Sequence, residues 1–329
     1  MLTAPPKQPK LLSMSNNKYR LSLITTIYGV EPYIAKFAES FLGQTSIMPG
    51  CVQFIFVNDG TKDRSMEILN RVIEERFEHL NEHITIINKE NGGLPLARKS
   101  GLDRAEGEYI LFADADDWLE LDAARKIIDK IDETHADIIY FDIVKEYGYK
   151  QSIKHEREYT TESRYLWIEN IFNYRSHGYT ATKCFRRSLY TDNKIFTPKL
   201  GMHEDMYLMS QIIAKAESIV HLHEVLYHYR KDNENAMCSQ RRKVRHIASS
   251  RNLLDLYSKF MDDLADSPIR DVADGIVLRA GWHQIIHKCD LYGEYPWLGE
   301  AIRRAHVSTR YRTPLLFQLI VKCYNRMFH

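Results

Sequence analysis

Three carboxylates lie within four positions at Asp114-Ala115-Asp116-Asp117, directly after the apolar run 109–113. Carboxylates this close repel one another unless a cation neutralises them, and hard oxygen ligands of this kind suit Mg²⁺ or Mn²⁺. These cations bind through one or two carboxylates and complete their coordination with water and substrate phosphates. We therefore expect Asp114 and Asp116 to hold a cation and a nucleotide. For Asp117 and Asp122, capping of the following helix is an equally good interpretation.

Polar turns follow two other apolar runs. Asp59 comes after the run 52–57, where a carboxylate could accept a hydrogen bond from a nucleobase N–H, although turns select Asn, Asp and Gly in any case. Asn91-Gly92-Gly93 precedes a predicted helix and has the composition of a loop that approaches an anion. Arg98 on that helix could reach a diphosphate or could be a surface residue. The sequence has neither GxGxxG nor a P-loop pattern, which counts against a dinucleotide dehydrogenase and a P-loop NTPase.

An alternation of strands and helices must position these turns. Helical spacing of apolar residues predicts helices between the strands, one of them with an apolar face from Leu69 to Leu80. Alternation of this kind is typical of a doubly wound α/β sheet, in which ligands bind beyond the carboxyl ends of the strands. The polar turns would then meet along one rim. Apolar, β-branched runs predict the strands at 21–28, 52–57, 83–88, 109–113 and 137–144.

In order and spacing, four segments resemble glycosyltransferase family 2: Ile27-Tyr28-Gly29-Val30-Glu31, Val57-Asn58-Asp59-Gly60-Thr61, 90–98 with Asn91-Gly92-Gly93 and Arg98, and 112–118 with the three carboxylates. The resemblance implies a GT-A fold, which is a Rossmann-like, mostly parallel sheet flanked by helices. It also implies an inverting, metal-dependent transfer from a UDP-sugar, with Mn²⁺ or Mg²⁺ as cofactor. The nucleotide-sugar-binding residues would be Thr26, Tyr28, Glu31, Asp59, Asn91, Gly92, Arg98, Asp114 and Ala115.

The resemblance also assigns individual roles to these residues. Asp59 would hold the uracil, and Arg98 would lie near the phosphates. Asp114 and the adjacent backbone would bind the ribose and diphosphate region. The metal ligands would be Asp116 and Asp114.

The segment Gly201-Met202-His203-Glu204-Asp205-Met206 looks like the Glu-Asp segment of the family on the acceptor side. The resemblance places the catalytic base on Asp205, with Glu204 as its orienting neighbour, because the acceptor hydroxyl must lose a proton as it attacks the anomeric carbon. Alternatively, both acids simply begin the helix predicted at 206–216, where they favour its dipole. Three basic or aromatic positions are candidates for contact with acceptor or phosphate, although a solvated surface is nearly as good an interpretation: Lys183, His203 and Arg230.

The charges are unevenly distributed along the chain. The 45 basic and 44 acidic residues give a net charge of +1, but 301–329 contains six basic residues and no acid, so 1–300 has a net charge of −5. From Pro314 an amphipathic helix is predicted, with Leu316, Leu319, Ile320, Cys323 and Met327 on one face. This basic tail suits an anionic membrane surface, while packing on the body or in a homodimer interface is an equal alternative. The acidic remainder argues against nucleic-acid binding.

We expect three regions: a flexible leader at 1–18, a GT-A nucleotide-sugar-binding and catalytic domain at 19–235, and a helical C-terminal region at 236–329 with the basic tail. No run of about 20 apolar residues is present, and the leader lacks the long apolar segment of a signal peptide. The five cysteines show no metal-like spacing and favour reduced thiols. These observations indicate a cytoplasmic protein, and the resemblance implies peripheral attachment to the inner face of the cell membrane.

The function expected from the resemblance is hexosyl transfer to a glycan acceptor, with a lipid-linked precursor of surface polysaccharide, capsule or lipopolysaccharide as the favoured acceptor. Two alternatives stay open. A sugar-nucleotide nucleotidyltransferase also joins an α/β nucleotide site to acidic metal ligands, but it would release pyrophosphate. A non-catalytic sugar-nucleotide-binding module would bind UDP without turnover.

Overall fold

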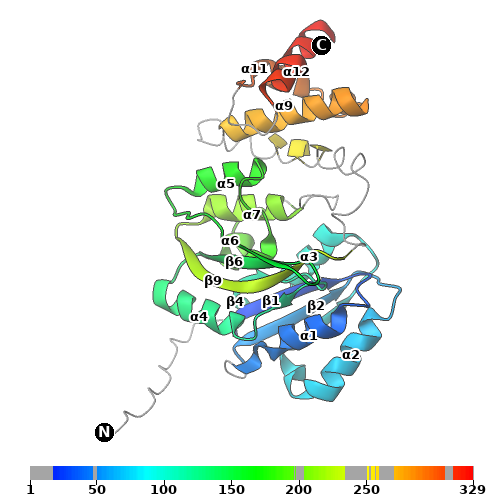
Figure 1. Cartoon of the computed structure of the whole chain (residues 1–329), viewed down its shortest axis with the longest axis vertical. Coiled ribbons are helices and arrows are strands. Elements are labelled where there is room, and N and C mark those ends of the chain that lie inside the picture. Colours follow the sequence, from blue (N-terminus) through cyan, green and yellow to red (C-terminus); the bar gives the residue numbers. More distant parts are fainter. Residues whose placement is uncertain are drawn as a thin grey trace.

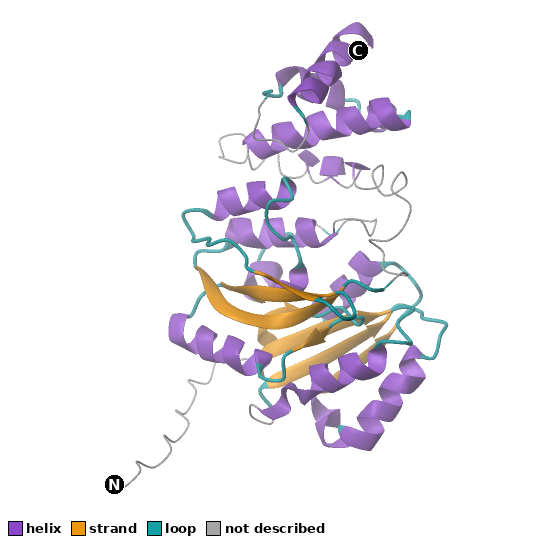
Figure 2. Ribbon diagram, in the orientation of Figure 1, coloured by secondary structure: helices purple, strands orange, loops and turns teal. Residues whose placement is uncertain are grey.

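The structure of the chain is a computed structural model that describes residues 18–46, 50–195, 197, 204–233, 250–251, 253–255, 257–258, 270–307 and 314–328. A mixed sheet lies between layers of helices, and the C-terminal helices stack beyond one of these layers (Figures 1 and 2). The α/β architecture expected from the alternating pattern is therefore confirmed. The predicted leader, apart from Lys18, and the predicted boundary at 235 lie outside the described residues.

The N-terminal half forms a parallel sheet with the strand order β3-β2-β1-β4. Residues on both faces of β1, including Leu23 and Ile24, are fully buried, as expected of a parallel strand covered on two sides. The strands are β1 (Tyr19–Ile27), β2 (Val52–Asn58), β3 (Ile84–Asn88) and β4 (Gly107–Phe112), and the helices between them are α1 (Ile34–Leu42), α2 (Ser65–Arg76) and α3 (Leu94–Leu102).

One expected helix is shorter than its apolar pattern. The apolar face from Leu69 to Leu80 is continuous and buried, but α2 ends at Arg76. Phe77 leaves the helical backbone at φ −131°, and a 3₁₀ turn, η2 (Glu78–His83), brings Leu80 into the same core. The two other described 3₁₀ turns are η1 (Gly43–Ser46) and η3 (Thr180–Thr182).

Beyond β4 the sheet becomes mixed. β8 lies antiparallel between β4 and β6, whereas β6 and β9 pair in parallel, so most paired residues in the described sheet are in parallel pairs. The further strands are β5 (Trp118–Leu119), β6 (Ile138–Glu146), β7 (Gln151–Lys154), β8 (Lys183–Arg186) and β9 (Ile219–Arg230). The helices of this part are α4 (Ala123–Thr134), α5 (Arg164–Phe172), α6 (Ser188–Thr191) and α7 (Glu204–Lys215).

Two buried clusters cover the two faces of the sheet. Side chains of α1, α2 and α4 form one cluster, and side chains of α3, α5 and α7 form the other. The polar ends of β1, β2 and β4 are consequently left at the rim of the sheet, where the sequence predicted the ligand site.

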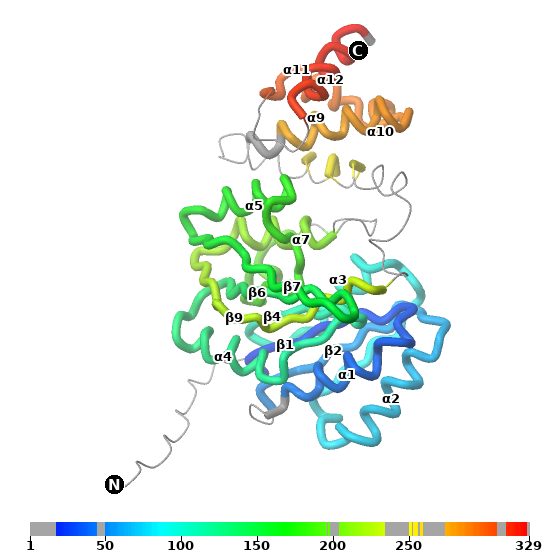
Figure 3. Tube along the Cα trace, viewed as in Figure 1, coloured from blue at the N-terminus to red at the C-terminus, as the bar shows by residue number. Residues whose placement is uncertain are grey.

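A third cluster holds the C-terminal helices together beyond α5 and α7 (Figure 3). Arg279 links this C-terminal layer to α5, because its Nη1 donates to the carbonyl oxygen of Phe172 at 3.0 Å. No helix among the described residues is long and apolar enough to cross a membrane. The helices are α9 (Arg270–His287), α10 (Leu291–Glu294), α11 (Leu298–Arg304) and α12 (Leu315–Phe328).

The amphipathic helix α12 packs through its more polar side. Gln318, Val321 and Asn325 are fully buried, and Asn325 Nδ2 donates to the carbonyl oxygen of Gly299 at 2.9 Å. The apolar face predicted from the sequence points outward, with Leu316 64% and Met327 71% exposed. The helix is therefore anchored to the body and still presents an apolar surface.

Candidate functional site

The acidic turn 114–117 is fixed between the end of β4 and strand β9. The N–H of Asp117 donates to the carbonyl oxygen of Asp114 at 3.0 Å, which closes the turn. Directly after it, β5 pairs antiparallel with β9, with Trp118 opposite His228. This short strand was not predicted, because two residues are too few to show a periodic pattern.

Asp117 fastens the turn to β9 and does not cap a helix. Its side chain is buried, and it accepts hydrogen bonds from the Tyr227 hydroxyl and from the Arg230 N–H, each at 2.7 Å. The same Tyr227 oxygen accepts the N–H of Asp114 at 3.0 Å. Asp122 occupies the N-cap position of α4 but makes no side-chain cap hydrogen bond.

Asp114 and Asp116 retain oxygens that can bind a cation. One oxygen of Asp116 accepts Asn233 Nδ2 at 2.8 Å, while the Asp114 side chain is 40% exposed. Burial raises the pKa of the Asp116 carboxyl, and the nearby charge of Asp114 raises it further. A divalent cation relieves this unfavourable pairing of carboxylates, so the donor set fits Mg²⁺ or Mn²⁺.

Arg98 joins the acidic turn to the predicted acceptor side. Its Nη2 donates to Asp114 at 2.9 Å, and its Nη1 donates to Glu204 at 2.7 Å. Burial alone would lower the pKa of the Arg98 guanidinium, but these carboxylates raise it above its usual range. The buried arginine is thus a permanent cation between the two carboxylates, and it is not a surface residue.

The Glu204-Asp205 pair begins α7, as the sequence indicated. Desolvation raises the pKa of both the Glu204 and the Asp205 carboxyl, while the positive charge of Arg98 opposes this rise. One Asp205 oxygen accepts the N–H of Met206 at 2.7 Å. Asp205 is partly exposed, whereas Glu204 is buried against Arg98.

Asp59 organises the glycine loop at the end of the next strand. Its two oxygens accept the N–H groups of Gly92 and Gly93, both at 2.9 Å, and the ammonium group of Lys89 pairs with it. The turn after Asp59 needs a glycine, because Gly60 has φ +69° and a Cβ there would lie 2.9 Å from the backbone nitrogen of Asn91. Asp59 is 3% exposed, so it holds the loop from beneath.

The other residues predicted to bind the donor lie at or just beyond the expected strand ends, and their surroundings differ from one residue to the next. Thr26 is next to last in β1, and Tyr28 beyond it is 56% exposed. Glu31 is bound by Arg64, whose Nη2 lies 2.7 Å from its carboxylate. Asn91 is exposed, and Ala115 is buried within the acidic turn.

Two of the three acceptor-side candidates are described. The Lys183 ammonium is buried and donates to the carbonyl oxygens of His177 and Tyr179 at 2.7 and 3.0 Å. Burial lowers its pKa to about 8. Arg230 donates through Nε to the carbonyl oxygen of Asp116 at 2.8 Å, so it lies at the acidic turn. His203 lies outside the described residues.

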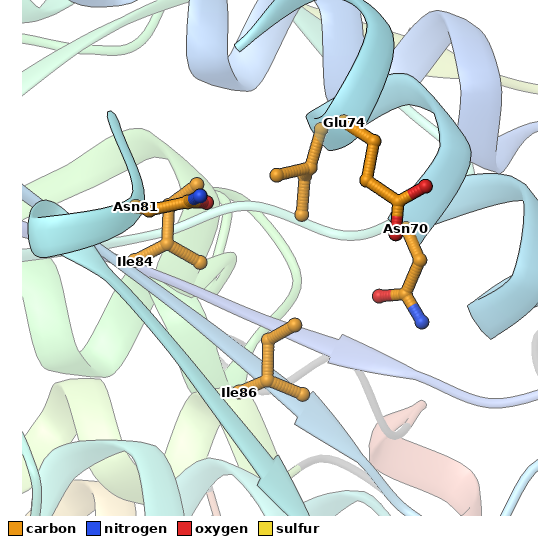
Figure 4. Close-up of a pocket in the computed structure, with 6 residues that line it drawn as sticks. Asn70, Glu74, Asn81, Ile84 and Ile86 are labelled. Carbon is orange, nitrogen blue, oxygen red and sulfur yellow. The ribbon is translucent and has the colours of Figure 1, made fainter. Parts of the chain in front are cut away.

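Sequence reasoning did not assign a role at the acidic turn to Tyr227 or Asn233, which both support it. Asn233 follows the strand without any pattern. A surface hollow between α2, η2 and β3 contains none of the predicted site residues (Figure 4). Its lining residues are Asn70, Ile73, Glu74, Asn81, Ile84 and Ile86.

Comparison with known sequences identifies related proteins. Residues 22–192 match the family described as Glycosyl transferase family 2. Glycosyltransferase GlyA of Streptococcus pneumoniae is 30% identical over 227 residues, which are 64% of this chain and 30% of that protein. The poly(ribitol-phosphate) beta-N-acetylglucosaminyltransferase TarS of Staphylococcus aureus is 27% identical over 218 residues, which are 65% of this chain and 36% of that protein. The matches thus span about a third of the length of these two relatives.

Solved structures show the same fold. A crystal structure of TarS 1–349 in complex with UDP-GlcNAc has a TM-score of 0.68 at 20% identity, covering 93% of this chain and 89% of that chain. Mannosyltransferase PcManGT from Pyrobaculum calidifontis, in complex with GDP-Man and Mn²⁺, has a TM-score of 0.52 at 14% identity, covering 95% and 88%. The expected GT-A fold is therefore confirmed.

Proposed function

The chain belongs to glycosyltransferase family 2, and on this basis we propose that it transfers a sugar from a UDP-sugar to a glycan acceptor with inversion at the anomeric carbon. The observation that carries the proposal is the position of Arg98, which contacts Asp114 on the donor side and Glu204 on the acceptor side. A single buried side chain thereby fixes the distance between the two groups of acids. Single displacement needs such a fixed distance, because donor and base must be held in line.

On the donor side, we assign the nucleotide to the rim formed by the ends of β1, β2 and β4. Asp59 would accept the uracil N–H with a remaining lone pair while it holds the Gly92 loop, and the exposed Tyr28 ring offers a surface for the base. Asp114 and the backbone at Ala115 would meet the ribose and the diphosphate. The UDP-GlcNAc bound in the TarS structure supports a UDP-sugar as the donor.

Asp114 and Asp116 would hold the divalent cation. When bound, Mn²⁺ or Mg²⁺ would neutralise charge on the departing diphosphate. Asn233 donates to one oxygen of Asp116, and Arg98 donates to one oxygen of Asp114. The other carboxylate oxygens are left available for the cation. The Mn²⁺ in the mannosyltransferase structure is consistent with such a cation in this fold.

On the acceptor side, Asp205 would accept the proton of the attacking hydroxyl. It is the more exposed of the two acids that begin α7, and its neighbour Glu204 is already engaged by Arg98. Glu204 therefore orients the helix start, while Asp205 is available to substrate. Lys183 and Arg230 would support the pocket indirectly. Lys183 would hold the loop 177–182, and Arg230 would hold the acidic turn.

We further propose that the acceptor is a lipid-linked precursor of a bacterial surface polymer and that the protein works at the inner face of the membrane. The TarS relative, which is named as a poly(ribitol-phosphate) beta-N-acetylglucosaminyltransferase, supports a polymer as the acceptor. The outward apolar face of α12 supports membrane contact, together with the positive charges of Lys322 and Arg326 on the same helix. Anionic lipid would satisfy both features, since each basic residue near such a surface contributes about 1 kcal/mol.

A donor screen tests the class of reaction. Purified protein is incubated with Mn²⁺ and a panel of sugar nucleotides, and released UDP and pyrophosphate are measured separately. We expect UDP release with at least one UDP-sugar. Release of pyrophosphate would identify a nucleotidyltransferase, and UDP binding without release from any donor would identify a binding module.

A further inference from the structure

A second cluster of metal-ligating side chains joins strand β9 to the segment between β7 and α5. It consists of Glu158, His221 and His223, whose potential ligand atoms all lie within 4.8 Å of one another. Glu158 Oε1 is 2.7 Å from His221 Nδ1 and 3.3 Å from His223 Nε2. None of these residues belongs to the proposed transfer site.

An irregularity in the strand brings the two histidines together. Residues two apart in a regular strand are separated by about 6.6 Å. Here the register with β6 shifts between Phe141, which pairs with Leu222, and Asp142, which pairs with Val225. The imidazole rings of His221 and His223 consequently lie with their centroids 4.2 Å apart. Both rings can therefore face Glu158, which comes from the segment between β7 and α5.

A buried carboxylate sets the orientation of His221. The Nε2 of His221 is 3.0 Å from Oδ1 of the buried Asp142, and the His221 ring stacks on Tyr140 with the centroids 4.5 Å apart. A histidine ligand of a metal ordinarily donates its other ring nitrogen to a carboxylate in this way. Asp142 is itself held in place, since its Oδ1 accepts the Glu156 N–H at 2.9 Å and its Oδ2 is 2.7 Å from His155 Nδ1. Asp142 is thus a stable acceptor for His221.

In this orientation, the close contact between His221 and Glu158 requires a positive charge between them. A neutral imidazole has one N–H, so donation from Nε2 to Asp142 leaves a lone pair on Nδ1. That lone pair then faces a carboxylate oxygen at 2.7 Å, which is favourable only when a proton or a metal cation lies between them. Two nitrogens and one oxygen that converge on a point form a common zinc donor set.

The distances are close to those of a tetrahedral site. Ligand atoms about 2.0–2.1 Å from Zn²⁺ lie about 3.3 Å from each other. The pair His223–Glu158 is already at 3.3 Å, and His221–Glu158 would open by about 0.6 Å from 2.7 Å. Glu158 can make this adjustment because its side chain is 64% exposed. Solvent reaches the exposed His223 side of the cluster, so water can supply the fourth ligand.

We propose that Glu158, His221 and His223 bind Zn²⁺ or a similar transition-metal ion, and that this ion ties the segment preceding α5 to strand β9. The site differs in chemistry from the carboxylates of the acidic turn, since imidazole selects Zn²⁺ whereas carboxylate oxygens select Mg²⁺ and Mn²⁺. Its role is structural. It is independent of the proposed transfer reaction, and its failure would leave that proposal unaffected.

Calorimetric titration tests the site. Full-length protein is stripped with chelator and titrated with ZnCl₂ in the presence of saturating Mg²⁺. We expect one Zn²⁺ per chain, with affinity lowered at least about 10-fold in Asp142→Asn, because that change removes the carboxylate behind His221. The variants His223→Ala and Glu158→Gln, both at exposed side chains, should lose the binding step. His79→Ala removes an exposed histidine outside the cluster and serves as the control.

Thermal unfolding provides a second readout that needs no activity. Zn²⁺ should raise the unfolding temperature of the wild-type protein, His79→Ala and Asp116→Ala, but not that of His223→Ala. UDP release by His223→Ala should stay at the wild-type level. Absence of a binding step in the wild type, or equal binding in wild type and His223→Ala, would overturn the proposal.

Discussion

Arg98 and Glu204, which are 106 residues apart in the chain, form a buried ion pair with Nη1 and Oε1 2.7 Å apart. Both side chains are at most 10% exposed, and the other guanidinium nitrogen holds Asp114. Breaking such a pair from one side leaves a buried charge without its partner, which is more costly than removing the pair as a whole.

Replacement of this arginine should therefore lower both stability and activity. We expect Arg98→Met to lower the free energy of unfolding by about 3–5 kcal/mol, because it leaves the Glu204 carboxylate uncompensated. The double variant Arg98→Met with Glu204→Gln should recover part of that loss. Urea unfolding of the single and double variants measures the coupling. Lys99→Ala is the matched control, since its ion pair with Asp103 lies at the surface. Equal losses in Arg98→Met and the double variant would contradict the account.

Tyr227→Phe should loosen the acidic turn. The change removes the hydroxyl that donates to Asp117 and accepts from the Asp114 N–H, so two buried polar groups lose a partner. We expect the free energy of unfolding to fall by about 1–3 kcal/mol. Mn²⁺-dependent UDP binding should weaken at the same time. Tyr147→Phe, at an exposed tyrosine, is the control for both measurements. Unchanged binding in Tyr227→Phe would show that β9 does not position the turn.

The rate of transfer should fall at acid pH. A base must be ionised to accept a proton, and desolvation raises the pKa of Asp205 above its ordinary value of 3.8. Activity is thus lost as the pH drops through this raised pKa. The positive charge of Lys183 opposes the rise, so Lys183→Met should move the acidic limb of the kcat profile to higher pH. A shift in the opposite direction would argue against Asp205 as the titrating base.

The outward face of α12 should bind anionic vesicles. We expect the double variant Leu316→Gln with Leu319→Gln to lose sedimentation with such vesicles, because it removes the exposed apolar area. Leu121→Gln, at a leucine that is 61% exposed elsewhere, should sediment like the wild type. Light scattering on the same proteins measures oligomeric state. A dimer that dissociates in the double variant, with no vesicle binding by the wild type, would show that the face joins two copies of the chain.

Much of the fold and the rim of the site was predictable, because strand periodicity and the rule that ligands bind beyond strand ends depend on local sequence. Asp114, Asp116 and Asp59 lie where that rule puts them. The partners of Arg98 and Asp59 were not predictable in the same way. Arg98 faces inward because its carboxylates come from the acidic turn after β4 and from the start of α7, and Asp59 contacts backbone N–H groups that carry no sequence signal.

The packing of α12 shows a similar limit of prediction from sequence. Its apolar and polar faces were read correctly from helical spacing, yet burial followed the hydrogen bond of Asn325 and the packing of Val321. Sequence spacing defines which residues share a face. Which face is covered depends on the shape of the neighbouring helices, and that information is distributed over α9 and α11.

We assign the cation to the acidic turn and the catalytic base to Asp205. The most direct test compares Asp205→Asn with Asp116→Ala in a UDP-release assay and in calorimetric UDP binding with Mn²⁺. Asp205→Asn should lower transfer at least about 100-fold and leave UDP binding intact, since it removes only the base. Asp116→Ala should abolish transfer and Mn²⁺-dependent UDP binding, while Asp122→Asn, at an acid beyond the turn, should match the wild type. Near-normal turnover by Asp205→Asn would contradict the assignment of the base.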